Sequence, residues 1–272
     1  MEPTTVNQQS VAVSIVSHGH GPWVLALLRQ MARQPEPCVK RVILTLNVPE
    51  PGLQQQLEQA QAGIDGLHLD IRHNRAPQGF ARNHNRALHG ASEDFVCILN
   101  PDMALLQSPT FGPLLACASQ PGMGLAYPVL CDPAGQWQDN ERALPSLRNL
   151  LRRRVLRQTE HRVDWVSGAC MVLRTRDWQA LGGFDEGFHM YCEDVDFSLR
   201  VRQQIGALVR APVWMQHQAQ RASSRQWLHL WWHVRSMWRL WHLPSFRWAL
   251  QHPSSQPRQP PPARPGNDST PC

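Results

Sequence analysis

Five carboxylates are concentrated in one short stretch of an otherwise basic chain of 272 residues. They lie between Gly182 and Arg200, and they are Asp185, Glu186, Glu193, Asp194 and Asp196. Gly182 and Gly183 precede the first two acids and suit a tight loop, where the backbone bends or approaches a ligand. A carboxylate held on a rigid element can accept a proton or bind a metal ion, so this stretch predicts catalysis.

Glu193 and Asp194 are expected to begin a helix, because apolar and basic residues follow them at helical spacing. Carboxylates at a helix start are favoured by the helix dipole, so we expect both to stay ionised. The structural alternative for Asp194 is a helix N-cap. For Asp196 we favour a capping or salt-bridging role, with Arg200 as a structural partner.

The composition describes a globular protein with an anionic partner. Hydrophobic residues make up 42% of the chain and charged residues 18%, which is typical of a folded core. The net charge of +6 predicts attraction to nucleic acid, an acidic membrane or a phosphorylated substrate. The seven cysteines form no CxxC pair, which favours reduced thiols in a cytosolic protein. The N-terminus lacks the pattern of a signal peptide, and no apolar run approaches the ~20 residues needed to cross a bilayer. We therefore expect a cytoplasmic protein, soluble or peripheral.

Strands and helices are predicted to alternate through residue 99. Apolar β-branched runs predict strands at residues 11–17, 39–47, 67–72 and 95–99, and the segments between them predict helices at residues 22–33, 51–62 and 79–89. This alternation predicts an α/β fold with a mostly parallel sheet and helices on both faces. Ligands bind such sheets at the carboxyl ends of the strands.

The order is less regular after residue 121. We expect strands at residues 123–130 and 163–173, a helix at 195–204, two short strands around Pro212 within 207–216, and a long amphipathic helix at 224–243. From Pro253 the chain is rich in Pro, Ser, Gln and Arg, which predicts a disordered tail. The predicted domains are therefore residues 1–222, a tryptophan-rich helical extension at 223–252, and the tail at 253–272.

Asp102 follows the predicted strand at residues 95–99, in the sequence Asn100-Pro101-Asp102. A carboxylate at this edge of the sheet can hold a Mg²⁺ or Mn²⁺ ion that also touches a diphosphate. The alternative is a simple turn, because Asn-Pro-Asp is a common turn sequence.

Several spans between residues 11 and 240, in the expected order, resemble the family 2 glycosyltransferases of the GT-A fold, within the rhamnosyltransferase-like bacterial branch. The matching spans are VAVSIVS, NRAPQGFARNHNRAL, ILNPDM, WVSGACMVLRT and GGFDEGFHMYCEDVDFSLR, followed by the isolated His217. The resemblance implies a Rossmann-like GT-A domain. It also implies that Asp194 is the catalytic base and that Asp102 binds the metal, with Asn100 replacing the first acid of a DxD-type motif. His217 matches a residue that completes the metal or diphosphate site in some relatives; the alternative is a solvent-facing histidine.

The resemblance also implies the remaining ligand contacts. Nucleotide contacts are expected from Ser17, Asn47, Gly79, Asn83 and Asn85, and sugar or acceptor contacts from Trp165, Gly168, Asp185, Glu186 and Glu193. For Asp185, a loop-structure role is an equal alternative. Many relatives carry an acid soon after the second strand; here that place has Asn47 and Glu50, which leaves the donor's identity open.

The chemistry implied is inverting glycosyl transfer. A metal ion neutralises the charge that develops on the departing nucleoside diphosphate, and a carboxylate accepts the proton of the attacking hydroxyl. The expected donor is a dTDP- or UDP-linked sugar, with rhamnose implied by resemblance, and the expected acceptor is a cell-surface glycan or lipid-linked hydroxyl. The alternative is a catalytically silent sugar-nucleotide-binding or membrane-scaffold protein of the same fold.

A row of apolar residues is expected along one face of the C-terminal helix. Trp227, Trp231, Val234, Trp238 and Trp241 share this face, and arginines flank them. Indoles and arginines favour an anionic membrane surface, and a run of arginines between residues 148 and 157 could add to it. The alternative is a helix that packs its tryptophans on the core. Nucleic-acid binding ranks last, because the acids cluster where the ligand site is expected.

Overall fold

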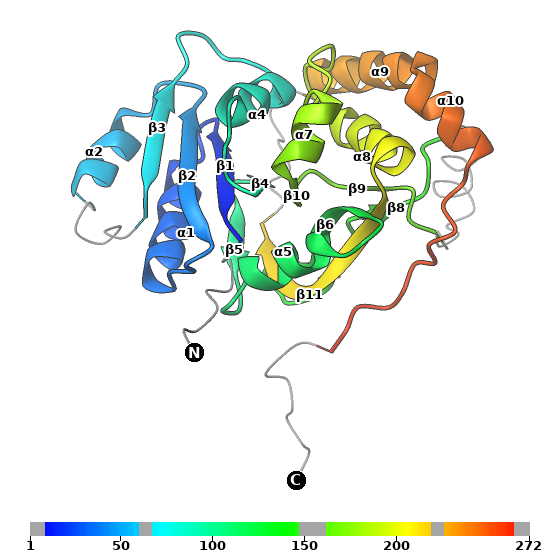
Figure 1. Ribbon diagram of the computed structural model, residues 1–272. Coiled ribbons are helices and arrows are strands. Elements are labelled where there is room, and N and C mark those ends of the chain that lie inside the picture. Colours follow the sequence, from blue (N-terminus) through cyan, green and yellow to red (C-terminus); the bar gives the residue numbers. More distant parts are fainter. Residues whose placement is uncertain (1–8, 60–66, 147–161, 219–225, 264–272) are drawn as a thin grey trace, which may run out of the picture.

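A nine-stranded, mostly parallel sheet forms the centre of the structure, a computed structural model that describes residues 9–59, 67–146, 162–218 and 226–263 (Figure 1). Its strands are β1 (Val11–Ser17), β2 (Val39–Leu46), β3 (Leu69–His73), β4 (Phe95–Leu99), β5 (Met103–Leu105), β6 (Met123–Cys131), β7 (Trp137–Gln138), β10 (Cys170–Arg174) and β11 (Ala207–His217). A separate ribbon pairs β8 (Glu141–Arg142) with β9 (Trp165–Val166). The helices are α1 (Gly21–Arg33), α2 (Pro51–Gln59), α4 (Phe80–Leu88), α5 (Phe111–Ser119), α7 (Thr175–Leu181), α8 (Glu193–Gln204), α9 (Gln226–His242) and α10 (Pro244–Gln251).

The strand order is β3-β2-β1-β4-β10-β6-β11-β5, with β7 beside β6. The first four strands are mutually parallel, β10 runs antiparallel to β4 and β6, and β11 runs parallel to β6. The predicted mostly parallel sheet is confirmed. Because β10 is reversed, its first residue lies at the edge where β1, β2 and β4 end. The turn before β10 therefore joins the edge at which ligands bind in sheets of this kind.

Side chains of β1 alternate between two hydrophobic cores, as expected for a strand buried on both faces. Val11, Val13 and Ile15 pack with residues of α1, α2 and α5, whereas Ala12 packs with residues of α4, α7 and α8. Figure 1 shows α4, α7 and α8 along one side of the sheet. Helices therefore cover both faces, as predicted.

Two strand predictions need correction. Residues 163–173 form two short strands, β9 and β10, because a turn at residues 167–169 interrupts them and sends β9 to the separate ribbon. Residues 207–217 form one strand, β11, where two were expected around Pro212. The pairing of β11 with β6 shifts between Arg210 and Trp214, so Pro212 lies in an irregularity that requires no N–H from it.

The C-terminal helices pack on the outer side of α8. Leu240 of α9 and Phe246 of α10 form a third core with Val195 and Leu199 of α8. The single helix predicted at 224–243 is thus followed by a second one, which has Pro244 in its first turn, where a missing N–H costs nothing. None of the described helices is long and apolar enough to cross a membrane.

The predicted disordered tail is wrong for residues 253–263, which lie along the body of the protein. Gln256 accepts a hydrogen bond from the backbone of Val163, and Arg210 donates to the carbonyl of Gln259. Arg258 pairs with a carboxylate oxygen of the β7–β8 turn at 2.7 Å. The segment has few apolar side chains to bury, so these polar contacts hold it against the protein. Residues 264–272 lie outside the described part of the chain.

Candidate active site

Asp102 and His217 lie next to each other at the carboxyl edge of the sheet. Asp102 is in the turn between β4 and β5, and Met103 of β5 pairs with His217 at the end of β11. His217 Nε2 is 3.5 Å from Asp102 Oδ1, and its Nδ1 is 2.8 Å from Oε1 of Gln138. An amide oxygen only accepts, so His217 donates from Nδ1. Nε2 therefore faces Asp102, where it can bind a metal ion in the neutral ring or donate a hydrogen bond to the carboxylate in the protonated ring.

The electrostatics of Asp102 agree with this arrangement. Burial raises the pKa of Asp102, but the hydrogen bond and charge of His217 outweigh it, and the pKa lies below its usual value. His20, in the loop after β1, also interacts electrostatically with Asp102. Burial is the largest influence on His20 and leaves its pKa lowered. The Asp102 carboxylate is thus held ionised beside two imidazoles.

Asn47 and Asn83 are buried and hold the loop that precedes α4. Asn47 Oδ1 accepts from Asn74 Nδ2 and from the backbone of Gln78, both at 2.8 Å. Asn74 Nδ2 also donates to Asn83 Oδ1 at 2.6 Å. Asn83 Nδ2 donates to the carbonyls of Gln78 and Gly79. These two predicted nucleotide residues shape the loop, and Asn74 is a member of the network that the sequence reasoning missed.

Glu50 occupies the place where relatives were expected to carry an acid after the second strand. The buried hydroxyl of Ser17 donates to Glu50 Oε1 at 2.6 Å, and the backbone of Gly19 donates to the same oxygen at 3.1 Å. Glu50 therefore fixes the loop after β1. Ser17, which was predicted to contact the nucleotide, uses its hydroxyl to hold Glu50.

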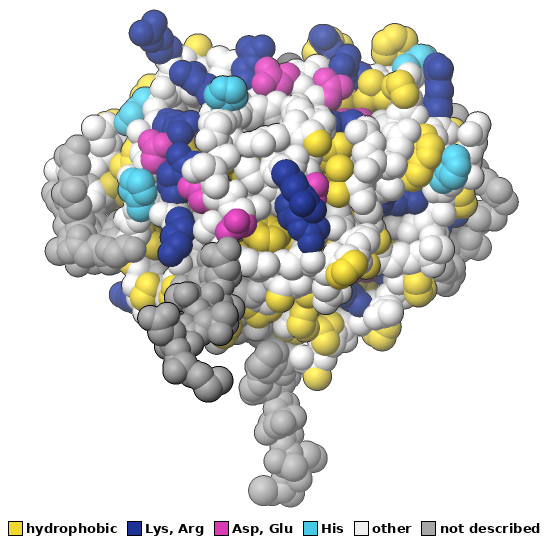
Figure 2. All heavy atoms as spheres, in the orientation of Figure 1, with side chains coloured by type: hydrophobic (Ala, Val, Ile, Leu, Met, Phe, Trp, Pro, Cys, Tyr) yellow, Lys and Arg dark blue, Asp and Glu magenta, His cyan; other side chains and the backbone are white. Residues whose placement is uncertain are grey.

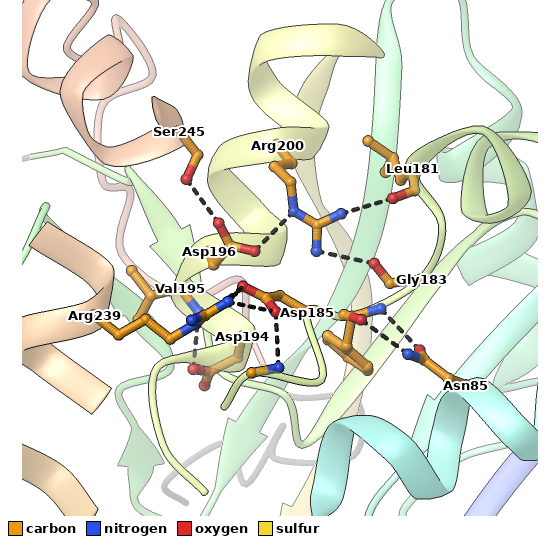
Figure 3. Close-up of polar contacts among 12 residues, drawn as sticks. Asn85, Leu181, Gly183, Asp185, Asp194, Val195, Asp196, Arg200, Arg239 and Ser245 are labelled. Carbon is orange, nitrogen blue, oxygen red and sulfur yellow. Dashed lines mark hydrogen bonds and ion pairs between the residues drawn. The ribbon is translucent and has the colours of Figure 1, made fainter. Parts of the chain in front are cut away.

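Asp185 anchors the loop between α7 and α8 to α9 (Figure 3). Both of its oxygens accept from Arg239, at 2.8 to 3.2 Å, and Oδ1 also accepts from the backbone of Gly187 at 2.8 Å. The Arg239 guanidinium lies over the Phe188 ring, 5.4 Å from its centroid. These contacts favour the loop-structure interpretation of Asp185.

Glu186 and Asn85 hold the same loop from the side of α4. Glu186 Oε2 accepts from Arg82 Nε at 2.9 Å, and its Oε1 accepts from Asn85 Nδ2 at 3.2 Å. Asn85 also exchanges two hydrogen bonds of 2.8 Å with the backbone of Phe184 (Figure 3). Both side chains thus position the loop, and their contacts with a ligand stay a prediction.

Gly79 is required by close packing. A Cβ at this position would lie 2.6 Å from the backbone oxygen of His189. The loop between α7 and α8 thus closes over the start of α4. The absence of a side chain at Gly79 is therefore explained by packing, whether or not a nucleotide binds there.

Glu193 and Asp194 begin α8 as predicted, but the expectation that both stay ionised is wrong. Burial raises the pKa of Asp194 to about 6 and that of Glu193 to about 8. The backbone N–H groups of Gly168 and Val195 donate to the two oxygens of Asp194, at 3.2 and 2.9 Å, which favours its ionised form. Oε2 of Glu193 has no hydrogen-bond partner among the described residues. Burial thus favours the neutral acid at both positions, and at Asp194 the two backbone N–H groups oppose it.

The backbone just before α8 is strained. Tyr191 and Cys192 have φ values of 72° and 66°, in the left-handed region that side chains other than glycine disfavour by about 1–2 kcal/mol each. Strain of this kind concentrates at functional sites.

Asp196 and Arg200 have the structural roles expected of them. Arg200 Nε donates to Asp196 Oδ2 at 2.7 Å, and the other Asp196 oxygen accepts from the Ser245 hydroxyl at 2.7 Å (Figure 3). Arg200 also donates to the carbonyls of Leu181 and Gly183. This cluster links α8 to the loop that begins at Gly182 and to α10.

A cavity of about 560 Å³ opens at the start of α8. Glu193, Asp194, Trp165 and residues of α9 line it. Asp185 and Glu186 do not line this cavity. A cavity of about 680 Å³ lies at the other end of the strands, beside Asp94, and none of the predicted site residues lines it.

The turn at residues 167–169 joins the two parts of the site. On one side Gly168 donates to Asp194, and on the other the carbonyl of Ala169 accepts from the backbone of Asn100 at 2.8 Å. Asn100, two residues before Asp102, and Asp194 are therefore hydrogen-bonded to adjacent residues of one turn.

Comparison with known proteins shows which family the chain belongs to. The profile of the family described as "Glycosyltransferase like family 2" matches residues 8–239. The chain is 27% identical to rhamnosyltransferase WbbL of Escherichia coli over 70% of its own length and 76% of that protein. It is 32% identical to N-acetylglucosaminyl-diphospho-decaprenol L-rhamnosyltransferase of Mycobacterium tuberculosis, a match that spans 40% of the chain and only 41% of that enzyme.

Solved structures show the fold. The chain matches mannosyltransferase PcManGT from Pyrobaculum calidifontis, in complex with GDP-Man and Mn²⁺, with a TM-score of 0.63 and 16% identity over 91% of this chain and 75% of that one. It matches GalNAc-T7 with UDP, GalNAc and Mn²⁺ with a TM-score of 0.63 and 16% identity over 78% of this chain and 43% of that one. The chain therefore belongs to glycosyltransferase-like family 2, and it is a glycosyltransferase of the GT-A fold.

Proposed function

We propose that this protein transfers a sugar, with inversion, from a nucleoside diphosphate to an acceptor hydroxyl, and that Asp194 is the general base. The observation that carries this assignment is the placement of one ionised carboxylate, Asp194, on the wall of a cavity, held by two backbone N–H groups. A base so held is oriented before the acceptor arrives, and general-base catalysis is typically worth about 10²–10⁴-fold.

The residues at the other part of the site fit a Mg²⁺ or Mn²⁺ ion. Asp102 offers a carboxylate oxygen, and His217 offers Nε2 while its Nδ1 is fixed by Gln138. Within the described residues, no three His, Cys, Asp or Glu side chains form a metal-binding group. Two protein ligands suit an ion that takes its other ligands from water and a diphosphate. When bound, such an ion supplies Lewis-acid neutralisation of the charge on the leaving group.

The transfer itself is a displacement at the anomeric carbon of the sugar, assisted by residues of this chain. The acceptor hydroxyl gives its proton to Asp194 as its oxygen attacks the anomeric carbon, and the bond from that carbon to the diphosphate oxygen breaks. A single displacement from the opposite face inverts the anomeric configuration. Gly168 and Val195 keep the Asp194 oxygens in place while the proton is transferred.

For the donor we propose rhamnose linked to dTDP or UDP, and for the acceptor a glycan carried on a lipid diphosphate. The names of the E. coli and M. tuberculosis relatives support rhamnose, and the second of these names states an N-acetylglucosaminyl-diphospho-decaprenol acceptor. A thermal-shift screen of nucleotide sugars with Mn²⁺ tests the donor, because a ligand that binds the folded state raises the apparent stability. We expect a rhamnose donor to stabilise the wild-type protein and not Asp102→Asn. Stabilisation by other sugars alone would contradict the donor assignment.

We also propose peripheral contact with the inner face of an anionic membrane through α9. Trp231 and Trp238 are 54% and 64% exposed. In Figure 2, hydrophobic, basic and histidine side chains lie side by side at the upper right, where Figure 1 shows α9. Trp241 packs against the third core, so the packing alternative holds for part of the helix. The side chain of Trp227 and the arginines at 148–157 lie outside the described part of the structure.

Flotation with anionic liposomes tests this contact. We expect the double variant Trp231→Ser/Trp238→Ser to lose binding, because exposed indoles favour the membrane interface. Unchanged flotation of that variant would exclude α9 as the membrane contact.

The silent-protein alternative is not favoured, because the chain keeps Asp194, Asp102 and His217. Hydrolysis of the nucleotide sugar without an acceptor separates the two: we expect a slow metal-dependent release of nucleoside diphosphate from the wild-type protein.

A further inference from the structure

The cavity at the start of α8 is lined by residues of two helices. Glu193, only 7% exposed, and Asp194 of α8 line its polar end, called the floor below, and Val234, Met237 and Trp238 of α9 also line it. Because Asp194 accepts the acceptor's proton in the proposed function, the acceptor enters this cavity. The side chains of α9 that line the cavity therefore contact the bound acceptor directly.

Glu193 is a buried carboxyl group with an unsatisfied oxygen. It is only 7% exposed, and its Oε2 has no partner among the described residues. A buried polar atom without a partner costs about 1–3 kcal/mol, so such atoms are rare in folded proteins unless they have a use. Glu193 also lines the cavity, so a ligand that enters it is a candidate for the missing partner.

Two indole rings in the cavity are held in fixed orientations. Trp165 donates its ring N–H to the carbonyl of Ala143 at 2.9 Å, and Trp241 donates to the carbonyl of Pro145 at 3.0 Å. Both polar groups are thus satisfied by the backbone, and the ring faces remain for apolar contact. Rigid aromatic walls with a few polar groups are typical of sites that bury small ligands.

The apolar wall continues out of the cavity. Val234 and Trp238 line it and are also 61% and 64% exposed. A ligand that leaves the cavity along α9 therefore passes over apolar side chains, whereas at the floor it meets two carboxyl groups. This order of polar floor and apolar exit matches a molecule with a hydroxylated head and an apolar chain.

We infer that the cavity between α8 and α9 binds an acceptor whose sugar head contacts Glu193 and whose own apolar carrier chain lies on Val234 and Trp238. The inference rests on the proposed function, and it assigns α9 to acceptor recognition. Glu193 is a positioning residue that hydrogen-bonds an acceptor hydroxyl other than the attacking one.

The chain contact is tested with two soluble probes that share the head N-acetylglucosaminyl diphosphate and differ in the alkyl ester, methyl or undecyl, without membranes and below micelle concentrations. The wild-type protein is expected to show a KM for the undecyl probe about tenfold lower than for the methyl probe, since each buried methylene favours binding. The double variant Val234→Ser/Trp238→Ser is expected to lose this difference. Leu250→Ser, which changes a side chain 55% exposed on α10, is the matched control and should keep it.

A Glu193 series tests the head contact. Glu193→Gln keeps a hydrogen-bonding group of the same shape and is expected to keep the KM within about threefold. Glu193→Met removes it and should raise the KM of both probes about tenfold, yet raise the melting temperature, because an unpartnered buried carboxyl is lost. A merely structural glutamate would instead lower the melting temperature when replaced.

The outcomes separate this inference from the proposed function. Donor hydrolysis without acceptor reports the catalytic site alone and should persist in Val234→Ser/Trp238→Ser and in Leu250→Ser. If hydrolysis is present but Val234→Ser/Trp238→Ser leaves the two KM values in their wild-type ratio, the chain contact is wrong and the function stands. A chain-length effect that appears only with liposomes would show that the carrier chain lies in the membrane and not on Val234 and Trp238, and would also overturn the inference. Absence of hydrolysis in the wild-type protein would count against the proposed function itself.

Discussion

Gly168 donates its backbone N–H to Oδ2 of Asp194 over 3.2 Å, so the turn before β10 directly orients a carboxyl group at the start of α8. The N–H of Val195 donates to the other oxygen at 2.9 Å. These hydrogen bonds favour the carboxylate, whereas burial favours the neutral acid and raises the pKa of Asp194 to about 6. The balance leaves a base that is ionised at neutral pH and more basic than an exposed aspartate.

We predict an acidic limb near pH 6 in the profile of kcat/KM against pH. Asp194 can accept a proton only when ionised, so the rate should fall about tenfold per pH unit below that value. Steady-state transfer measured from pH 4.5 to 8 with a saturating metal concentration checks this. A limb near pH 4, the value of an exposed aspartate, would show that the base is not buried.

Stability should also depend on pH through Glu193. Burial raises its pKa to about 8, above the value of about 4.3 in an unfolded chain, so the folded state binds the extra proton. This contribution to stability is fully present below pH 4 and is lost as the pH rises through 8. Urea unfolding at pH 5 and pH 8 should therefore show a larger loss for the wild-type protein than for Glu193→Gln. Equal losses would contradict the pKa direction.

The pairing of Asp185 with Arg239 should couple α9 to the loop that leads into α8. We expect Arg239→Ala to lower the free energy of unfolding by about 1 kcal/mol, because a bidentate pair is lost at a partly exposed site. A double-mutant cycle with Asp185→Ala measures the coupling. Arg235→Ala is the matched control, since Arg235 lies on the same helix over the Trp231 ring. Additive effects of Arg239→Ala and Asp185→Ala would show that the two residues do not interact.

Gly79 should tolerate no side chain. The Cβ of Gly79→Ala would meet the His189 carbonyl oxygen at 2.6 Å, and we expect a loss of about 1–3 kcal/mol in the free energy of unfolding. Gly52→Ala is the control, because nothing lies within 4 Å of its Cβ position in α2 and alanine favours a helix. Chemical denaturation of both variants compares them. Similar stabilities would mean that the loop moves aside at no cost.

The sequence predicted the elements that have a strong period and the residues that follow them directly. β1, β4 and the start of α8 lie where the apolar pattern indicates, and Asp102 follows its strand as expected. Residues 163–173 were misassigned as one strand because most of them are apolar, and the interruption at Gly168 depends on hydrogen bonds to Asn140 and Asp194 from elsewhere in the chain.

The missed parts of the site depend on contacts between distant residues. Asp185 and Arg239 are 54 positions apart, and nothing in the pattern around either residue indicates its partner. The raised pKa of Glu193 is caused mainly by burial, which outweighs the helix dipole that the sequence indicates. The order of residues 253–263 likewise depends on side chains of Arg210 and Asp139 that meet the tail only in the folded protein. Two residues did have a signal in the sequence: Glu50 is the first acid after the second strand, and Asn74 begins the matching span NRAPQGFARNHNRAL.

The rate of sugar transfer by Asp194→Asn in a single turnover, with saturating Mn²⁺ and nucleotide-linked rhamnose, tests the central assignment most directly. We expect transfer to fall by about 10²–10⁴-fold while the Mn²⁺-dependent thermal shift on donor binding is retained, because the variant loses the proton acceptor and keeps Asp102 and His217. Transfer by Asp194→Asn at close to the wild-type rate would contradict the assignment of Asp194 as the base.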